Sequence, residues 1–129
     1  MLNYSWRDYG NRVGVWRCLE LFDELKLPAA ALINTALYGN CPEVIEACVK
    51  RGDDLVGRGH TNSERQGEMS EDKERALLLY CKEEIRTASK SDPSGWLSPW
   101  ISESAVTPDL LAETGYRYTL NWLHPENVA

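Results

Sequence analysis

A short polar segment near the middle of the chain holds the side chains that are best suited to chemistry. Histidine is the side chain that exchanges a proton near neutral pH, so His60 is the candidate general acid or base. Arg58 and Asn62 flank it, and a guanidinium suits an anionic ligand group or a developing oxyanion. The sequence shows no carboxylate that would orient the His60 ring. The alternative, a solvent-exposed loop histidine, therefore stays open.

Three tryptophans are the candidates for binding a ring-shaped ligand. Trp96, Trp100 and Trp122 can form an aromatic wall, although core packing explains Trp96 equally well and Trp100 suits either role. For Glu103 the sequence predicts a solvated loop carboxylate. For His124 it predicts a histidine at the surface. The candidate substrate-binding residues are Arg58, Asn62, Trp96, Ser98, Pro99, Trp100, Asn121 and Trp122.

Helical and strand patterns alternate along the chain and would position these residues. An amphipathic helix is predicted after a turn at Tyr9-Gly10-Asn11, and Pro42 and Ser70 are favourable starts for two others. The charged start of the third helix, residues 71–75, predicts a solvated face. Helices are expected over 13–25, 42–52, 70–89 and 107–115, and short strands over 29–33, 54–57, 95–97 and 116–120.

Strands that are separated by single helices predict a parallel sheet with right-handed crossovers, either an open α/β layer or part of a barrel. Ligands in both folds bind beyond the carboxyl ends of the strands. Segments 58–62, 98–102 and the residues from Asn121 onward follow three of the predicted strands. We therefore expect these segments to meet at one rim and to form the site.

The net charge, the apolar runs and the cysteine spacing indicate which partners and which cellular compartment to expect. A net charge of −6 with no basic patch argues against nucleic acid as a partner. No apolar run is long enough for a membrane span, and the first eight residues lack the order of a secretion signal, so a cytoplasmic address is expected. The four cysteines lack metal-site or disulfide-scaffold spacing, and we expect reduced, mostly buried thiols.

Three stretches carry a resemblance to a known family. They are YGNRVGVWR at 9–17, RGDDLVG at 51–57 and GWLSPW at 95–100. In order and spacing they resemble the polysaccharide deacetylase (NodB-like) superfamily, nearest its allantoinase-like branch, over nearly the whole chain. The resemblance implies a distorted (β/α) barrel, of which residues 1–129 would form a single incomplete domain, truncated at both ends. It also implies hydrolysis of non-peptide C–N bonds, in N-acetylated sugars or in ureides such as allantoin.

The metal-binding motifs of that family are not retained. Its acidic first strand would precede Met1, and its His-x-x-x-His pair falls on Arg58 and Asn62. A frame that starts at His60 places Glu64 four residues on, but it breaks the match to the preceding strand. Complete members use zinc held by imidazoles and a carboxylate. We expect no such cofactor here, because these ligands are missing.

Other family positions have changed as well. The Arg-x-Pro motif reads Leu97-Ser98-Pro99, without its arginine, and Asn121 stands where an acidic residue often precedes the tryptophan. The strands that bring the general-acid histidine would follow Ala129. Hydrolysis is therefore expected to be weak or lost, with His60 as the one catalytic candidate and a small molecule or sugar as the ligand.

A different class of function also fits the sequence. A half-barrel has open edges and a bare interior, so it is expected to self-associate and to act as a non-catalytic binding or structural homo-oligomer. A third possibility is that the chain is a truncated reading frame of a complete enzyme. These alternatives remain open from the sequence alone.

Overall fold

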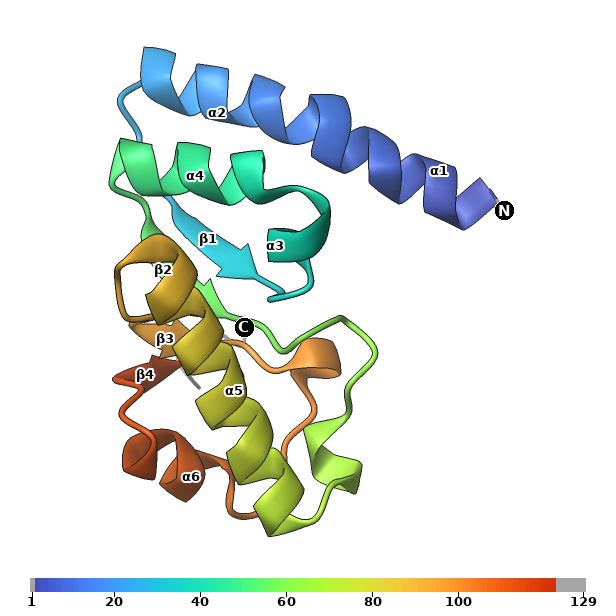
Figure 1. Ribbon diagram of the computed structural model, residues 1–129, viewed down its shortest axis with the longest axis vertical. Helices are drawn as coiled ribbons and strands as arrows, with labels where there is room; N and C mark the ends of the chain where they lie inside the picture. The colour runs from blue at the N-terminus through green and yellow to red at the C-terminus, as the bar shows by residue number, and fades with distance from the viewer. Residues whose placement is uncertain (1, 123–129) are drawn as a thin grey trace, which may run out of the picture.

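The computed structural model describes residues 2–122, in which helices and strands alternate (Figure 1). The elements are α1 (Leu2–Tyr9), the π-helical η1 (Gly10–Gly14), α2 (Val15–Glu24), β1 (Ala30–Ile33), α3 (Leu37–Asn40), α4 (Pro42–Arg51), β2 (Asp54–Gly57), the 3-10 turn η2 (Gln66–Glu68), α5 (Glu71–Ser89), β3 (Gly95–Trp96), the 3-10 turn η3 (Pro99–Ile101), α6 (Thr107–Glu113) and β4 (Tyr118–Thr119). None of the helices in this part of the chain has the length and apolar character that a membrane crossing requires.

The strands form one four-stranded sheet in the order β1-β2-β3-β4. All three pairings are parallel, with Ala30 opposite Asp54, Val56 opposite Gly95 and Gly95 opposite Tyr118 in register. Each crossover carries a helix, as parallel pairing requires. The predicted α/β fold with parallel strands is confirmed, and four successive parallel strands correspond to part of a barrel.

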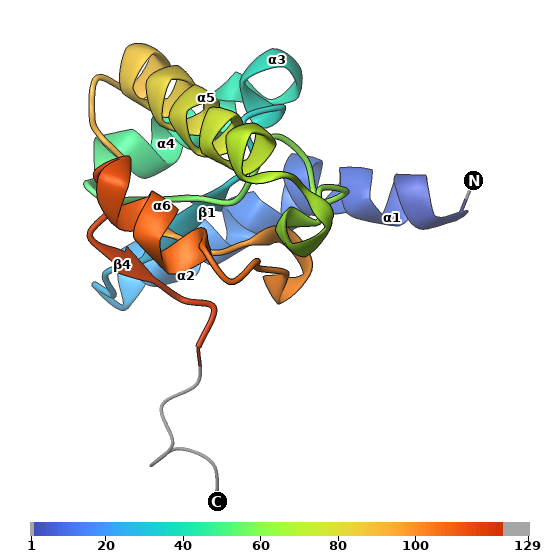
Figure 2. The same cartoon turned by 90° about the horizontal axis from the view of Figure 1, so that it is seen from below.

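Helices α4, α5 and α6 pack on one face of this sheet, and Figure 2 shows α4 and α5 together on one side of the strands. Two clusters of buried side chains lie between the layers. The first joins Leu78, Cys81, Trp96, Leu110, Leu111 and Tyr116. The second joins Ile33, Ile45, Leu55 and Ile85. The core therefore uses alternate residues of each strand, as expected for side chains that point to opposite faces.

Few of the described residues cover the opposite face of the sheet. Leu32 on β1 is 42% exposed, and Leu120, just beyond β4, is 46% exposed. Tyr118 lies across Gly95, where an added Cβ would be 2.2 Å from its ring, and its hydroxyl donates to Asp54 Oδ2 at 2.8 Å. A hydrogen bond from Ser94 Oγ, at 2.6 Å, lowers the pKa of Asp54. In the register of the strands, the Tyr118 ring covers Val56, while Leu32 and Leu120 stay open.

The N-terminal region differs from the prediction. The sequence predicts a turn at Tyr9-Gly10-Asn11, but α1 continues through η1 into α2, and together they form one long projecting helix (Figure 1). A π-turn inserts an extra residue without ending a helix, so Gly10 does not act as a stop. α3 was not predicted either, because a four-residue helix is too short to show a hydrophobic period.

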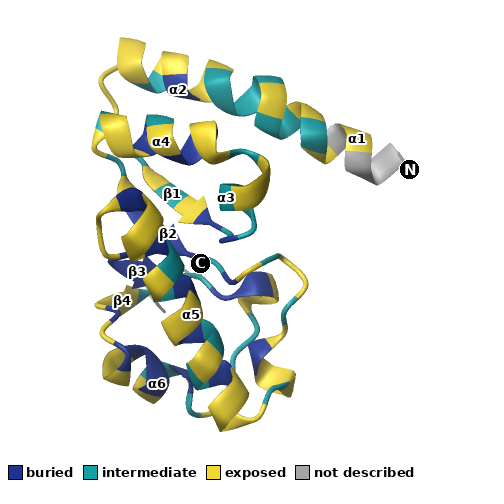
Figure 3. Ribbon diagram, viewed as in Figure 1, coloured by how far each residue is buried: buried dark blue, intermediate teal, exposed yellow. Residues whose placement is uncertain are grey.

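A single arginine ties α2 to the rest of the domain. Arg51 donates to Asp53 Oδ2 at 3.0 Å and to the carbonyl oxygens of Leu19 and Leu27 at 3.4 and 3.2 Å. It also pairs with Asp23. Leu19 is the one buried residue of α2, and Figure 3 shows exposed surface over much of this helix. The arginine contacts therefore supplement a small apolar interface.

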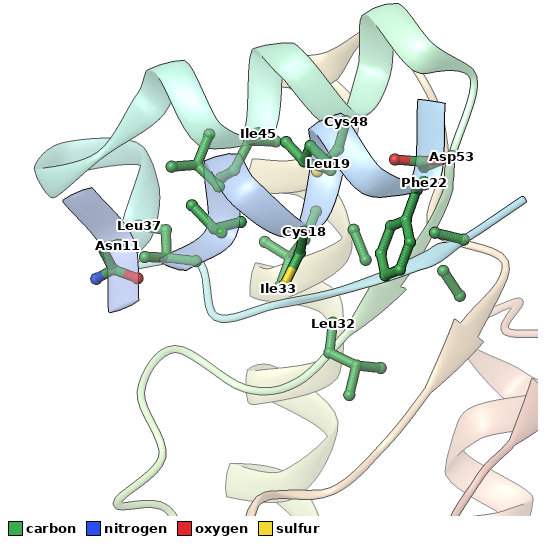
Figure 4. Close-up of a pocket in the computed structure, with 15 residues that line it drawn as sticks. Asn11, Cys18, Leu19, Phe22, Leu32, Ile33, Leu37, Ile45, Cys48 and Asp53 are labelled. Atoms are coloured by element: carbon green, nitrogen blue, oxygen red, sulfur yellow. The ribbon is translucent and has the colours of Figure 1, made fainter. Parts of the chain in front are cut away.

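A pocket of about 260 Å³ separates α2 from β1 and α4 (Figure 4). Val15, Leu19 and Phe22 line it from the helix, and Ile45 and Cys48 line it from α4. Leu32 points away from these side chains, toward the opposite face of the sheet (Figure 4). The lining is mostly apolar and holds none of the candidate site residues.

The cysteines are all free, but they differ in burial. Cys48 and Cys81 are buried, Cys41 is half-buried and Cys18 is exposed, so the expectation of mostly buried thiols is wrong for Cys18. Cys18 lines the open pocket between α2 and β1, where its side chain stays accessible to solvent (Figure 4). Burial raises the pKa of the Cys81 thiol to about 12 and also raises the pKa of Cys48.

Thiol reactivity is expected to follow this order, because the thiolate is the reactive form and access is required. In the native protein, a disulfide reagent such as DTNB should modify Cys18 quickly and leave Cys48 and Cys81 unmodified until the chain is unfolded. Cys18→Ser should remove the fast phase. Rapid modification of Cys81 without denaturant would contradict the packing of α5 on the sheet.

Candidate functional site

The predicted rim segments do meet at one edge of the sheet. Beyond the strands, the ladder continues with Arg58 N donating to Ile33 O at 2.8 Å and Leu97 N to Gly57 O at 2.9 Å. Leu120 N donates to Trp96 O at 2.9 Å. The three segments therefore leave their strands at the same level. This is the position where ligands bind in parallel α/β folds.

Arg58 and Asn62 contact each other. The Nε of Arg58 donates to Asn62 Oδ1 at 3.1 Å, and Arg58 is half-buried while Asn62 is exposed. Asn34, just after β1, donates from its side-chain amide to the Arg58 carbonyl oxygen. The two positions that the sequence resemblance assigns to imidazoles are thus occupied by a guanidinium and an amide that bond to each other.

His60 is exposed, in agreement with the alternative of a solvent-exposed loop histidine. Its ring nevertheless has a fixed orientation. Thr35, which is buried, places its hydroxyl 2.9 Å from His60 Nδ1. The Tyr80 ring lies edge-on at 5.7 Å between centroids. Among the residues that the structure describes, Nε2 has no hydrogen-bond partner. The sequence could not indicate Thr35, because 25 residues separate it from His60.

Glu64 supports the loop rather than His60. Its two carboxylate oxygens accept from Thr61 N at 3.0 Å each, and Oε1 also accepts from Thr61 Oγ1 at 3.1 Å. Gly59 has a φ of +76°, and a Cβ there would approach Glu64 Oε2 at 2.8 Å. The carboxylate therefore caps a tight turn between the candidate residues.

A second polar group forms around Asn121. Its side-chain oxygen accepts from Ser98 N at 2.8 Å, and its amide nitrogen donates to Ser98 Oγ at 2.8 Å and to Glu103 Oε2 at 2.9 Å. The indole of Trp122 donates to Glu103 Oε1. Glu103 is half-buried and accepts from two side chains of the rim. It is not the solvated loop carboxylate that the sequence predicts, since Asn121 and Trp122 reach it from beyond β4.

The tryptophans separate into core and surface. Trp96 is fully buried and donates from Nε1 to Gln66 Oε1 at 2.8 Å and to Ser98 Oγ at 3.0 Å, so core packing is the role that the structure shows. Ser98 and Pro99 are also buried. Trp100 and Trp122 are each 66% exposed. Of the predicted aromatic wall, only these two rings can touch a ligand. His124 lies outside the described residues.

Trp100 is presented by an unusual loop. Its φ is +62° and that of Ile101 is +53°, two consecutive non-glycine residues in the left-handed region. Such conformations cost free energy and occur most often at functional sites. The guanidinium carbon of Arg65 stands 5.0 Å from the centre of the Trp100 ring, within cation–π distance. One face of this indole is thus already covered.

A buried carboxylate lies beneath the rim. Glu74 is fully buried and accepts from Gln66 Nε2 at 3.0 Å, from Ser104 Oγ at 2.6 Å and from Thr107 Oγ1. The prediction of a solvated face at 71–75 is therefore wrong for Glu74. Its partners come from two loops and the start of α6, and through Gln66 it connects to Trp96.

Comparison with known proteins agrees with this architecture. The family model for polysaccharide deacetylase matches residues 5–119. The chain belongs to the polysaccharide deacetylase family. It is 27% identical over 116 residues to a peptidoglycan deacetylase of Helicobacter pylori, covering 90% of this chain and 39% of that protein.

Two solved structures extend the comparison. A Mycobacterium smegmatis protein assigned as a polysaccharide deacetylase is 30% identical with a TM-score of 0.83, and the match covers 89% of this chain and 40% of that one. The Puue allantoinase is 28% identical with a TM-score of 0.72, and the match covers 87% of this chain and 36% of that one. The chain thus spans roughly two fifths of the length of the relatives that it matches.

Polysaccharide deacetylases generally depend on a metal, so the described residues can be tested against zinc. No group of three or more His, Cys, Asp or Glu side chains within residues 2–122 comes together in a way that could hold a metal ion. A guanidinium such as that of Arg58 is a cation that has no lone pair to give and repels a divalent ion, and the carboxylate of Glu64 accepts hydrogen bonds from Thr61. The residues of this rim do not fit the zinc site of the family.

Proposed function

We propose that this chain is a polysaccharide deacetylase-like domain that binds an N-acetylated sugar or a ureide at its rim, with C–N hydrolysis weak or lost. The observation that carries the proposal is the contact between Arg58 and Asn62, at the two positions where the family places imidazoles. Both residues follow β2 at the carboxyl edge of the sheet. The rim at the carboxyl edge can therefore still bind a ligand, but it lacks the imidazoles that would hold a metal ion to activate water.

Hydrolysis of an amide or ureide requires an activated water, stabilisation of an oxyanion and a proton for the leaving nitrogen. His60 is the candidate for the proton transfer, and the hydroxyl of Thr35 fixes its ring at Nδ1. A hydroxyl orients an imidazole but does not stabilise its charged form as a carboxylate would. A slow residual reaction is the most that this arrangement supports.

Ligand binding is better supported than turnover. Trp100 and Trp122 offer exposed aromatic faces, and the half-buried carboxylate of Glu103 beside them has lone pairs that can accept further hydrogen bonds. Flat rings beside polar groups suit the apolar faces and the hydroxyl or amide edges of sugars and ureides.

The pure chain should be incubated with N-acetylglucosamine oligomers and with allantoin, while acetate release and allantoin consumption are followed. We expect no turnover, or turnover that is slow and lost in His60→Ala. Titration calorimetry with the same compounds should show binding that Trp100→Ala weakens and Trp16→Ala, on α2 and away from the rim, does not. Rapid turnover would contradict the loss of activity, and a lack of binding would overturn the proposal.

A second candidate function is self-association. Residues 29, 31 and 33 direct their backbone groups to β2, because Asp54 N donates to Ala29 O and Arg58 N to Ile33 O. Ala30 and Leu32 therefore direct theirs to the outer edge, where none of the described residues bonds to them. A free parallel edge beside exposed Leu32 favours pairing with another chain.

Light scattering over a range of concentrations tests this alternative. A homo-oligomer is expected, and Leu32→Lys should shift it toward the monomer. Leu79→Lys is the matched control, because Leu79 is 50% exposed on the helical side of the domain. A strictly monomeric wild-type chain at high concentration would rule out self-association as the function.

A further inference from the structure

Arg58 carries a charge that no acidic residue of the described chain neutralises. Five arginines have a carboxylate within 4 Å: Arg12, Arg51, Arg65, Arg75 and Arg86. Arg7, Arg17 and Arg117 have none among the described residues, and all three are exposed to water. Arg58 is the one unpaired arginine that is half-buried. Burying an uncompensated charge costs free energy, so its retention needs an explanation.

The position of Arg58 directs its side chain to the face of the sheet opposite α4, α5 and α6. A Cβ on Gly57 would meet the Trp96 ring at 2.7 Å, so position 57 faces the helices. Because successive residues of an extended strand alternate, Arg58 faces the other way. In the extended register Arg58 lies between Asn34 on one side and the half-buried Leu97 on the other. Leu120, which is 46% exposed, lies next to Leu97 on the same face. Apolar neighbours strengthen a charge interaction relative to open water.

The guanidinium is also oriented. Its Nε donates to Asn62 Oδ1 at 3.1 Å, which leaves the edge with Nη1 and Nη2 without a partner among the described residues. The side-chain amide of Asn34 donates to the carbonyl oxygen of Arg58 and so fixes the backbone at position 58. The two terminal nitrogens of a guanidinium match the two oxygens of a carboxylate, and such bidentate pairs are among the strongest hydrogen-bonded contacts.

Glu103, the acidic side chain of the rim, does not serve as this partner. Its two oxygens accept from Asn121 and Trp122, and it is not within 4 Å of Arg58. The chain as a whole is acidic, with a net charge of −6, so attraction of an anion must be local to Arg58.

We propose that the ligand of this rim bears a carboxylate and that Arg58 binds it. The inference rests on the proposed function and names the charge of its substrate class. The carboxylate can belong to an acidic N-acetylated sugar or to a ureido acid, and both present the same group to the guanidinium. Recognition of the anion then replaces the metal contact that other members of the family make at this position.

Matched ligand pairs that differ in one carboxylate test the proposal. The first pair is N-acetylmuramic acid and N-acetylglucosamine, and the second is allantoate and allantoin. For at least one pair, titration calorimetry at low salt should show the acid binding about tenfold or more tightly than the neutral compound, as expected for a charged hydrogen bond. The pair that shows the preference identifies the source of the carboxylate.

Three variants assign the preference to Arg58. Arg58→Gln should abolish it, Arg58→Lys should retain part of it, and Arg117→Gln should leave it unchanged, since Arg117 is unpaired but lies before β4 at the other end of the sheet. If Arg58→Gln fails to fold, the wild-type preference should still fall steeply as salt is added.

The outcomes separate the two proposals. Equal wild-type affinity within both pairs, or a preference that survives in Arg58→Gln or in high salt, would overturn the anion inference and leave the rim as a site for neutral ligands. A lack of binding by all four compounds would overturn both.

Discussion

Replacing Trp96 with alanine is expected to lower the free energy of unfolding by about 3–5 kcal/mol. The side chain is fully buried between the sheet and helices α5 and α6, where it packs with Leu78, Leu110 and Tyr116. The substitution removes these contacts and leaves a cavity. It also leaves the Gln66 side-chain oxygen without the indole that donates to it at 2.8 Å.

The same substitution at Trp100 is the matched control. Trp100 is 66% exposed, and alanine tolerates its φ of +62° no worse than tryptophan does. Its removal should change the stability by about 0.5 kcal/mol or less. Urea denaturation of the two variants measures both values. If both variants lose similar amounts of stability, Trp96 is not a core residue. It would then again be a candidate for contact with the ligand.

The elements that sequence patterns identify well are those with strong local signals. Residues 54–57 form β2 as predicted, and Gly52, with a φ of +80°, ends α4. Ser70 caps α5 by accepting from Lys73 N. Each signal lies within about one turn of the boundary that it marks, and so the boundary can be recognised without knowing the fold.

The rim was predictable for a different reason. Parallel strands end at one edge, so the segments after β2, β3 and β4 had to converge once the alternation of strands and helices was recognised. The direction of each side chain was not predictable. Trp96 and Trp100 are four residues apart and equally aromatic, and only the three-dimensional packing places one in the core and the other in solvent.

The contacts that organise the site join distant parts of the chain. Thr35 orients His60 across 25 residues, and Asn121 reaches Ser98 across 23. Polar side chains of this kind carry no periodic pattern, and their partners are set by the crossovers between strands. The sequence therefore predicts a solvated Glu103, although two side chains beyond β4 donate to it.

Glu74 is the position where sequence and structure differ most, and replacing it is expected to have the second large effect. Glu74→Leu keeps a similar volume but removes the acceptor of Gln66, Ser104 and Thr107. A buried donor without an acceptor costs about 1–3 kcal/mol. Ser104 and Thr107 stand 3.3 Å apart and can bond to each other, so the expected loss is about 3 kcal/mol rather than the full sum.

Glu74→Gln should cost less, about 1 kcal/mol, because the amide keeps one acceptor oxygen and a hydroxyl can rotate to accept from the amide nitrogen. Glu46→Gln, on the exposed side of α4, is the control and should leave the stability unchanged. Thermal denaturation ranks the variants, and the NMR signal of the Trp96 indole N–H reports whether Gln66 has moved. If Glu74→Leu is as stable as the wild type and the indole signal does not shift, Glu74 faces water. The loops of the rim would then lack the buried anchor that joins Gln66 and Ser104.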